Sequence, residues 1–253
     1  MALVTTPAVL LRSFPYSETS RILRFFTPGH GVVGVMARGA RKGGGKGTAP
    51  LESFAGGVLT LHLKQTSDLH NMKEFNPSRP RSGLGRHLLR FGGASLLAEL
   101  VLRHAGEESN PPLFEGLEEG LDRLDAAPEE ALPGVVLSRG WGVVGVLGYE
   151  PVLDACVEGG EPFGDDEIGR FDFAAGGLRC ASCATGLSGP RVGPRARDQL
   201  RALVRGEEVT PLERPRANLQ LLGDFVTYHV SGDRPLESFR FLAAVVPDDP
   251  CPG

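Results

Sequence analysis

The sequence lacks the features of a membrane or secreted protein. In its 253 residues no apolar run approaches the roughly 18 to 20 residues that a membrane-spanning helix needs. The first residues, Met1 to Pro7, lack the charged segment and apolar core of a secretory signal. Four cysteines are too few for a disulfide scaffold in a chain of this length. We therefore expect a cytoplasmic protein with no membrane partner, and 41% hydrophobic residues suffice for ordinary buried cores.

Patterns of catalytic residues are also missing. The six histidines show no metal-ligand spacing such as His-x-x-x-His, and no Gly-x-Ser-x-Gly surrounds a serine. The glycine-rich basic stretch breaks the phosphate-loop pattern, because Gly47 stands between Lys46 and Thr48. We therefore expect a protein that is not an enzyme. One alternative stays open, a metal-dependent nuclease using the acidic groups at 165–167 or 118–119.

Acidic residues are scarce at the N-terminal end. The first 90 residues hold 4 Asp and Glu against 13 Lys and Arg, whereas the remaining 163 hold 27 against 14. The formal net charge of −4 thus hides a basic N-terminal segment on an acidic body. Clustered cations repel one another unless an anion binds, so this imbalance favours a nucleic-acid partner.

Short apolar or alternating runs separated by turn residues predict strands in the first 80 residues. The predicted strands cover residues 8–14, 21–26, 32–37, 57–64 and 69–75. Five strands with no helical period among them predict a small OB-fold barrel, whose usual ligand is single-stranded nucleic acid or oligosaccharide.

Residues 38–47, between the third and fourth predicted strands, carry four cations among five glycines. A loop of this kind can follow a phosphate backbone while aromatic side chains stack on bases. A second basic cluster follows Asn76. The predicted DNA-binding residues are Arg38, Arg41, Lys42, Lys46, Arg79, Arg81, Arg86 and Arg90. The aromatic residues that either stack on bases or fill the barrel core are Phe14, Tyr16, Phe25, Phe26 and Phe54.

After Arg81 the apolar residues recur at steps of three and four, which predicts helices. The first runs from Leu84 to Ala105, and the second begins at an Asn110 cap with Pro111 in its first turn. The further predicted helices cover 135–147, 195–204, 218–230 and 236–246. The prediction is an α+β chain with an OB-fold barrel at 1–80, a helical bundle domain at 81–150 and 190–253, and a zinc-ribbon-like insertion at 151–189.

The insertion contains three of the four cysteines. Each knuckle of a zinc ribbon presents two thiolates to a tetrahedral ion, and Cys180 and Cys183 form one knuckle. The other knuckle is incomplete, because Gly159 stands three residues after Cys156 where a second thiolate belongs. One zinc bound by these three cysteines needs a fourth donor, and four remain open: Cys251, His229, Glu158 and water.

Two other interpretations of the insertion stay open. The ribbon could keep its shape without metal, through the packing of Phe171, Phe173 and Leu178. The Cys-x-x-Cys pair could instead be a redox pair, although no thioredoxin-like strand precedes it.

Several short motifs, in order and spacing, resemble the bacterial RecO recombination-mediator family over nearly the full length. The matching stretches are Glu18 to Gly31, Ala37 to Arg41, Leu147 to Cys156 and Phe173 to Cys183. The resemblance implies an OB-fold, a helical domain and a zinc-finger-like insertion, and Gly159 departs from the cysteine usual in that family. It also implies a role without catalysis in recombinational DNA repair.

The activities implied by the resemblance are binding of single- and double-stranded DNA and annealing of complementary strands. The implied partners are RecR, the acidic C-terminal tail of single-strand binding protein (SSB) and, indirectly, RecA. The SSB tail would dock on the helical domain, with Arg103, Arg123 or Arg139 beside an apolar groove. A nucleoid-associated location would follow. The remaining alternative is an OB-fold adaptor that binds protein without binding DNA.

Overall fold

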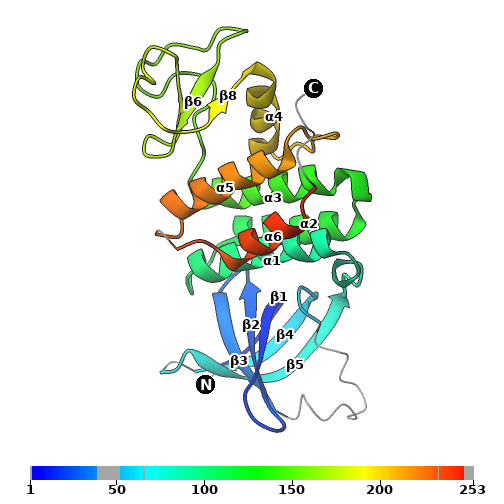
Figure 1. Cartoon of the computed structure of the whole chain (residues 1–253). Helices are drawn as coiled ribbons and strands as arrows, with labels where there is room; N and C mark the ends of the chain where they lie inside the picture. Colours follow the sequence, from blue (N-terminus) through cyan, green and yellow to red (C-terminus); the bar gives the residue numbers. More distant parts are fainter. Residues whose placement is uncertain (1, 39–51, 65, 233, 248–253) are drawn as a thin grey trace.

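The structure is a computed structural model that describes residues 2–38, 52–64, 66–232 and 234–247 (Figure 1). Arg41, Lys42, Lys46 and Cys251 lie outside the described residues.

Five strands form a closed barrel at the N-terminal end. They are β1 (Ala2–Pro15), β2 (Arg21–Thr27), β3 (Gly31–Ala37), β4 (Gly56–Leu63) and β5 (Leu69–Arg79). Their order is β1-β2-β3-β5-β4, with β3 and β5 parallel and β4 closing antiparallel onto β1. A closed five-stranded barrel of this kind is the OB-fold architecture, so the predicted fold class is confirmed. Leu10, Leu23 and Phe25 are fully buried inside it.

In the described part of the chain, six α-helices follow the barrel. They are α1 (Leu88–His104), α2 (Pro111–Ala126), α3 (Leu132–Val146), α4 (Pro194–Val204), α5 (Pro215–His229) and α6 (Glu237–Val245). The Asn110 side chain accepts a hydrogen bond from the Leu113 N–H, as the predicted cap requires. The first helix is shorter than predicted, because the His87 imidazole caps α1 at the Leu89 N–H. Residues Leu84–Arg86 form a separate 3₁₀ turn instead.

Helix α3 forms the centre of the bundle, in contact with α1, α2, α4 and α5. This position explains its almost wholly apolar sequence, because neighbouring helices cover it on several sides. Trp141 of α3 is 1% exposed, and its ring centroid lies 5.1 Å from that of Phe225 on α5.

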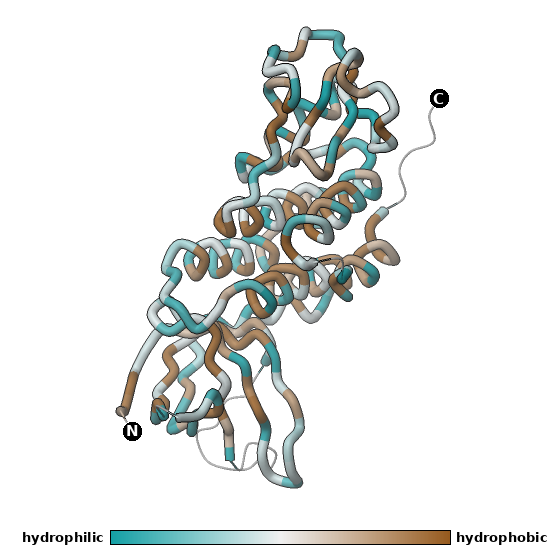
Figure 2. The backbone as a smooth tube through the Cα atoms, turned by 90° about the vertical axis from the view of Figure 1, so that its left-hand side faces the viewer, coloured by the Kyte–Doolittle hydropathy of each residue, from teal (hydrophilic) through white to brown (hydrophobic). Residues whose placement is uncertain are grey.

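The insertion contains a small antiparallel sheet of β6 (Gly169–Asp172), β7 (Gly177–Arg179) and β8 (Arg191–Val192), in the order β7-β6-β8. It lies at the end of the helical layer opposite the barrel (Figure 1). The view turned by 90° shows the same three parts stacked along one axis (Figure 2). Among the described residues, no helix is long and apolar enough to cross a membrane.

Candidate nucleic-acid interface and metal site

The predicted basic loop is only partly described. Arg38 follows β3 directly, is exposed and forms no ion pair with another described residue. It lies beside the ends of two other strands, because Ala37 pairs with Arg21 and Arg21 pairs with Pro15. This end of the barrel points away from the helices (Figure 1). The role of the other three loop cations stays a prediction.

A second group of cations lies on the outer face of β1 and β2. Arg12 and Arg24 are directly opposite one another across the two strands. Like charges in this position repel and destabilise a sheet unless something neutralises them. No described carboxylate does so, since neither arginine forms an ion pair within the described part of the chain. The pair is therefore suited to an external anion such as phosphate.

Exposed aromatic side chains accompany this pair. The Arg12 guanidinium lies 4.9 Å from the centroid of the Phe14 ring, which is 38% exposed. Tyr16, at 60% exposure, follows at the end of β1. Cations next to accessible rings are the features that hold a phosphate backbone and stacked bases in single-strand binders. We call Arg12, Phe14, Ile22 and Arg24 the outer barrel patch.

Glycine makes room for one member of the patch. Gly34 on β3 pairs with Arg24, and a Cβ atom at Gly34 would lie 2.9 Å from a terminal nitrogen of that guanidinium. The Arg24 side chain thus lies across the β3 backbone where no side chain intervenes. The sequence analysis names Phe14 but not Arg12, Ile22 or Arg24, although the alternation of strand side chains places Arg12 with Phe14 and Ile22 with Arg24.

Arg81 was predicted to contact DNA, and the structure contradicts this. Its side chain is 2% exposed and makes ion pairs of 2.9 Å with Glu118 and 2.6 Å with Asp122, both on α2. It also donates a 2.8 Å hydrogen bond to the Phe54 carbonyl. A guanidinium with these partners joins the barrel to the helices and cannot also bind phosphate.

The other three arginines of the second basic cluster differ in whether they have partners within the protein. Arg79 is half exposed, yet it pairs with the same two carboxylates at 3.2 and 3.0 Å. Arg90 donates a 2.7 Å hydrogen bond to the Ala127 carbonyl. Arg86 is exposed and has no side-chain partner among the described residues. A continuous basic track from Arg38 to Arg90 is therefore interrupted at Arg79 and Arg81.

Three of the five aromatic residues proposed as stackers belong to the core. Phe25 and Phe26 are fully buried and Phe54 is 5% exposed. Phe25 packs on Phe75 inside the barrel, with ring centroids 4.8 Å apart. Only Phe14 and Tyr16 of the five are accessible to a base.

The arginines considered for the SSB tail have internal partners. Arg123 and Arg139 both bind Glu208, and Arg103 pairs with Glu99 at 3.3 Å. The hydrogen bond from Arg123 holds the pKa of Glu208 below its usual value. Arg139 also lines a small hollow between α2 and α3, together with Leu113, Val143 and Val146.

The three cysteines of the insertion come together as their spacing predicts. The sulfur atoms of Cys156, Cys180 and Cys183 all lie within 4.8 Å of one another. Zinc–sulfur bonds of about 2.3 Å in a tetrahedron place two sulfurs about 3.8 Å apart, so the cluster fits a metal ion. Cys156 is buried, and its sulfur accepts backbone N–H groups from Gly159 and Cys180, each at 3.4 Å.

These surroundings give the thiols different acidities. Burial raises the pKa of Cys156, but the backbone N–H donors outweigh burial and lower the pKa to about 7. Hydrogen bonds with Cys180 and Cys156 raise the pKa of Cys183 to about 11. A thiolate is thus available at Cys156 near neutral pH, and thiolates are the form that binds metal.

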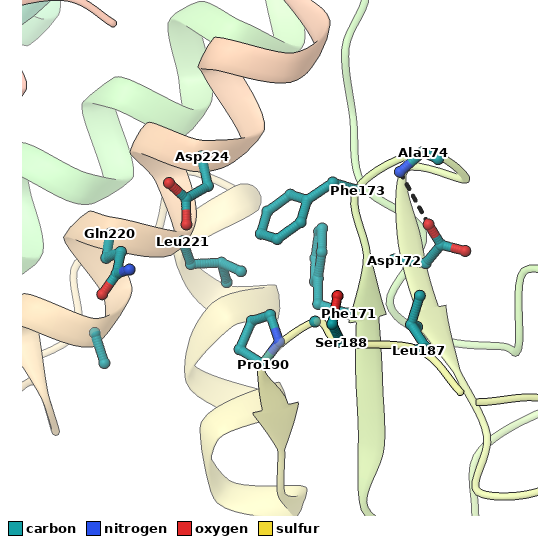
Figure 3. A pocket seen from close by; sticks show the side chains of 12 residues that line it. Phe171, Asp172, Phe173, Ala174, Leu187, Ser188, Pro190, Gln220, Leu221 and Asp224 are labelled. Atoms are coloured by element: carbon teal, nitrogen blue, oxygen red, sulfur yellow. Dashed lines mark hydrogen bonds between the residues drawn. The ribbon is translucent and has the colours of Figure 1, made fainter. Parts of the chain in front are cut away.

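The sheet of β6, β7 and β8 in the insertion is anchored to the helices by aromatic packing. The Phe171 ring lies 5.0 Å from Phe173 and 6.1 Å from Phe225 of α5, measured between centroids. Figure 3 shows Phe171 and Phe173 facing α5 across a hollow, with Asp224 on the far side. The Asp172 carboxylate points the other way and accepts the Ala174 N–H at 2.9 Å. The two carboxylates therefore do not converge on one point.

The acidic residues considered for a metal-dependent nuclease, among the described residues, do not form a metal-binding cluster either. Glu118 is engaged by Arg79 and Arg81. Within the described ranges, the cysteine cluster is the one group of three or more side chains that could hold a metal ion.

Comparisons with known proteins agree over most of the chain. The family model described as Recombination protein O N terminal matches residues 1–81, and Recombination protein O C terminal matches residues 86–238. A DNA repair protein RecO of Anaeromyxobacter sp. (strain K) is 33% identical over 257 residues, covering 96% of this chain and 97% of the relative. The Geobacter metallireducens protein of that name is 30% identical, with 96% and 98% covered. The Bacillus subtilis (strain 168) protein is 30% identical over 179 residues, or 69% and 66%.

Proposed function

Because the chain belongs to the RecO family of DNA-repair and recombination proteins, we propose that it works by binding DNA and protein partners, without catalysis. It binds single- and double-stranded DNA, anneals complementary strands and helps RecR load RecA onto strands coated by SSB. It acts in the cytoplasm at the nucleoid. In this proposal the chain divides into a DNA-binding barrel at 1–80, a helical domain at 81–150 and 190–253, and a metal ribbon at 151–189.

The unpaired arginines of the outer barrel patch carry this proposal. Two arginines at directly opposite positions of neighbouring strands, with no ion pair to a described carboxylate, cost stability in the free protein. Phosphates of a bound strand remove that cost, and the rings of Phe14 and Tyr16 are exposed for stacking. Arg38 and the three loop cations extend the phosphate-binding surface from the neighbouring strand end, and Arg86 adds a cation on the helical side.

Annealing follows from charge neutralisation. Two strands approach each other only when their phosphates are screened, and a basic surface that binds backbones leaves the bases free to pair. The reaction breaks no covalent bond, so it requires no nucleophile.

The helical domain supplies the protein contacts in this proposal. The hollow between α2 and α3 has apolar walls from Leu113, Val143 and Val146, and Glu119 and Arg139, which also binds Glu208, lie at its edge. The apolar end of an SSB tail would fill such a hollow, with its acidic residues reaching Arg139 in place of Glu208.

The insertion binds one zinc ion through Cys156, Cys180 and Cys183. Zinc in such a ribbon supplies no reaction and holds the two knuckles together. Metal analysis of the purified protein should give about one zinc per chain, and Cys180→Ser should remove it. A stoichiometric metal that survives Cys180→Ser would overturn the assignment, as would purified protein without zinc that takes up none when zinc is added.

A strand-annealing assay tests the proposed function. Wild type should accelerate annealing of complementary oligonucleotides, with and without SSB, and the advantage should shrink as salt rises. Arg12→Ala with Arg24→Ala should reduce the acceleration. Arg195→Ala removes a cation that is 84% exposed at the opposite end of the molecule and should behave as wild type. A protein that neither binds nor anneals DNA would support the adaptor alternative instead.

A further inference from the structure

The three thiols occupy three corners of a tetrahedral metal site, and the fourth corner, next to Gly159, is open. A Cβ atom built there lies 3.6 Å from the Cys183 sulfur and 3.9 Å from the Cys156 sulfur, in ordinary van der Waals contact. Apart from its own chain neighbours, no other described atom lies within 4 Å of that point. A donor starting from this carbon would complete the tetrahedron of thiolates, and glycine offers none. Because Gly159 is exposed, the corner faces solvent.

The described side chains named as donors from the sequence, Glu158 and His229, do not fill this corner. Glu158 is exposed and forms an ion pair with Arg179, whose guanidinium also binds Asp172 at 2.6 Å. Neither Glu158 nor any other described His, Asp or Glu joins the cysteine cluster.

His229 is held at the other end of β7. Its imidazole lies against Phe225, with ring centroids 4.5 Å apart, and 3.7 Å from a Cβ atom built at Gly176. From Gly176 the chain extends along β7 to Cys180, which at about 3.3 Å per residue separates the two by about 13 Å. His229 is therefore too far from the sulfurs to be a ligand.

One further polar group touches the sulfurs. The Ser182 hydroxyl lies 3.1 Å from the Cys180 sulfur and 4.0 Å from that of Cys183. Hydrogen bonds of this kind tune a thiolate without occupying a coordination position.

Building on the zinc site proposed above, we propose that the metal held by Cys156, Cys180 and Cys183 takes its fourth ligand from solvent, at the corner that Gly159 leaves open. The ligand is water in plain buffer and is exchangeable for a small nitrogen or sulfur donor. A neutral imidazole displaces the water directly, whereas a thiol binds as thiolate and releases its proton to the buffer. The ribbon thereby differs from a closed structural zinc site, in which the protein supplies all four ligands.

The experiment uses the full-length chain loaded with Co²⁺ in place of zinc, because the visible bands of Co²⁺ report its ligands. Imidazole added to wild type should shift these bands in a saturable way while cobalt stays bound at one per chain. Gly159→Cys should give a spectrum that imidazole does not change. It should also bind metal about tenfold tighter or more, since even outer-shell partners are worth 10- to 100-fold. Gly159→Ala, the matched control, adds the carbon without the donor and should show no such gain.

The contrary results identify other donors. Wild-type bands that imidazole leaves unchanged would overturn the open corner, whether or not Gly159→Cys folds. So would changed bands in Glu158→Gln or Cys251→Ser without imidazole, because the altered residue would then be a ligand. Failure of the zinc proposal itself looks different, because cobalt would then not bind stoichiometrically or would survive Cys180→Ser.

Discussion

Removing Arg12 and Arg24 together separates a DNA-binding role from a structural one. The two residues are cross-strand neighbours on β1 and β2 and form no ion pair with another described residue, while the Arg12 guanidinium lies over Phe14 and that of Arg24 lies over Gly34 of β3. In the free protein their loss should therefore leave stability unchanged or raise it slightly, by about 0.2–1 kcal/mol, because a like-charge pair is relieved. A structural role would instead lower stability.

The effect on DNA binding can be estimated from counterion release. Each phosphate contact to a single strand contributes about 0.7 to the slope of log affinity against log salt, so losing two contacts flattens the slope by about 1.4. Between about 50 and 200 mM salt, wild type should then lose about sevenfold more affinity than the double variant.

Fluorescence anisotropy of a labelled oligo-dT strand at several salt concentrations measures this slope, and thermal unfolding measures stability. Arg195→Ala, with one exposed cation removed far from the barrel, should keep the wild-type slope. An unchanged slope in a folded double variant would refute the argument, and a large fall in unfolding temperature would assign the pair a structural role.

Three further changes test other parts of the account. Replacing the four loop cations at 38, 41, 42 and 46 by Ala should flatten the single-strand slope by up to about 2.8, and an unchanged slope would sink the loop assignment. Arg81→Ala should cost about 1–3 kcal/mol in urea unfolding, because it leaves the buried Phe54 carbonyl without its donor and leaves Glu118 and Asp122 with Arg79 alone, whereas the exposed Arg79→Ala should cost under about 1 kcal/mol; equal costs would contradict the distinction. The Arg123 hydrogen bond lowers the pKa of Glu208, so its stabilisation is complete above the unfolded value of about 4.3 and is lost as pH falls through the lower folded value. Wild type should therefore lose more stability than Glu208→Gln between pH about 5 and 3, and parallel losses would contradict that linkage.

The strands and helices could be predicted because each has a regular local pattern. Alternation and turn residues located all five barrel strands, and the Asn110 cap with Pro111 located the start of α2. The cysteine cluster was also predictable. The Cys-x-x-Cys spacing defines one knuckle of a zinc ribbon, and Cys156 stands where the sequence of such a ribbon has its other knuckle.

The DNA-binding residues were harder to predict from the sequence, because charge alone does not distinguish a cation without an ion pair from one that has an ion pair. Arg81 looked like part of a basic cluster, yet its carboxylate partners lie about 40 residues away, one turn apart on α2. Arg12 and Arg24 are isolated in sequence and become a pair only through the strand register. That register depends on a bulge in β1 between Leu10 and Arg12, which no local motif announces.

The location of bound DNA is the most direct test of the account. Ultraviolet crosslinking of a bound single strand to wild type, followed by mass spectrometry of the peptides, should place crosslinks on Phe14 or Tyr16 in the segment from Arg12 to Arg24. Crosslinks confined to the helical domain or the ribbon, with none in that segment, would contradict the assignment of the barrel as the DNA-binding surface.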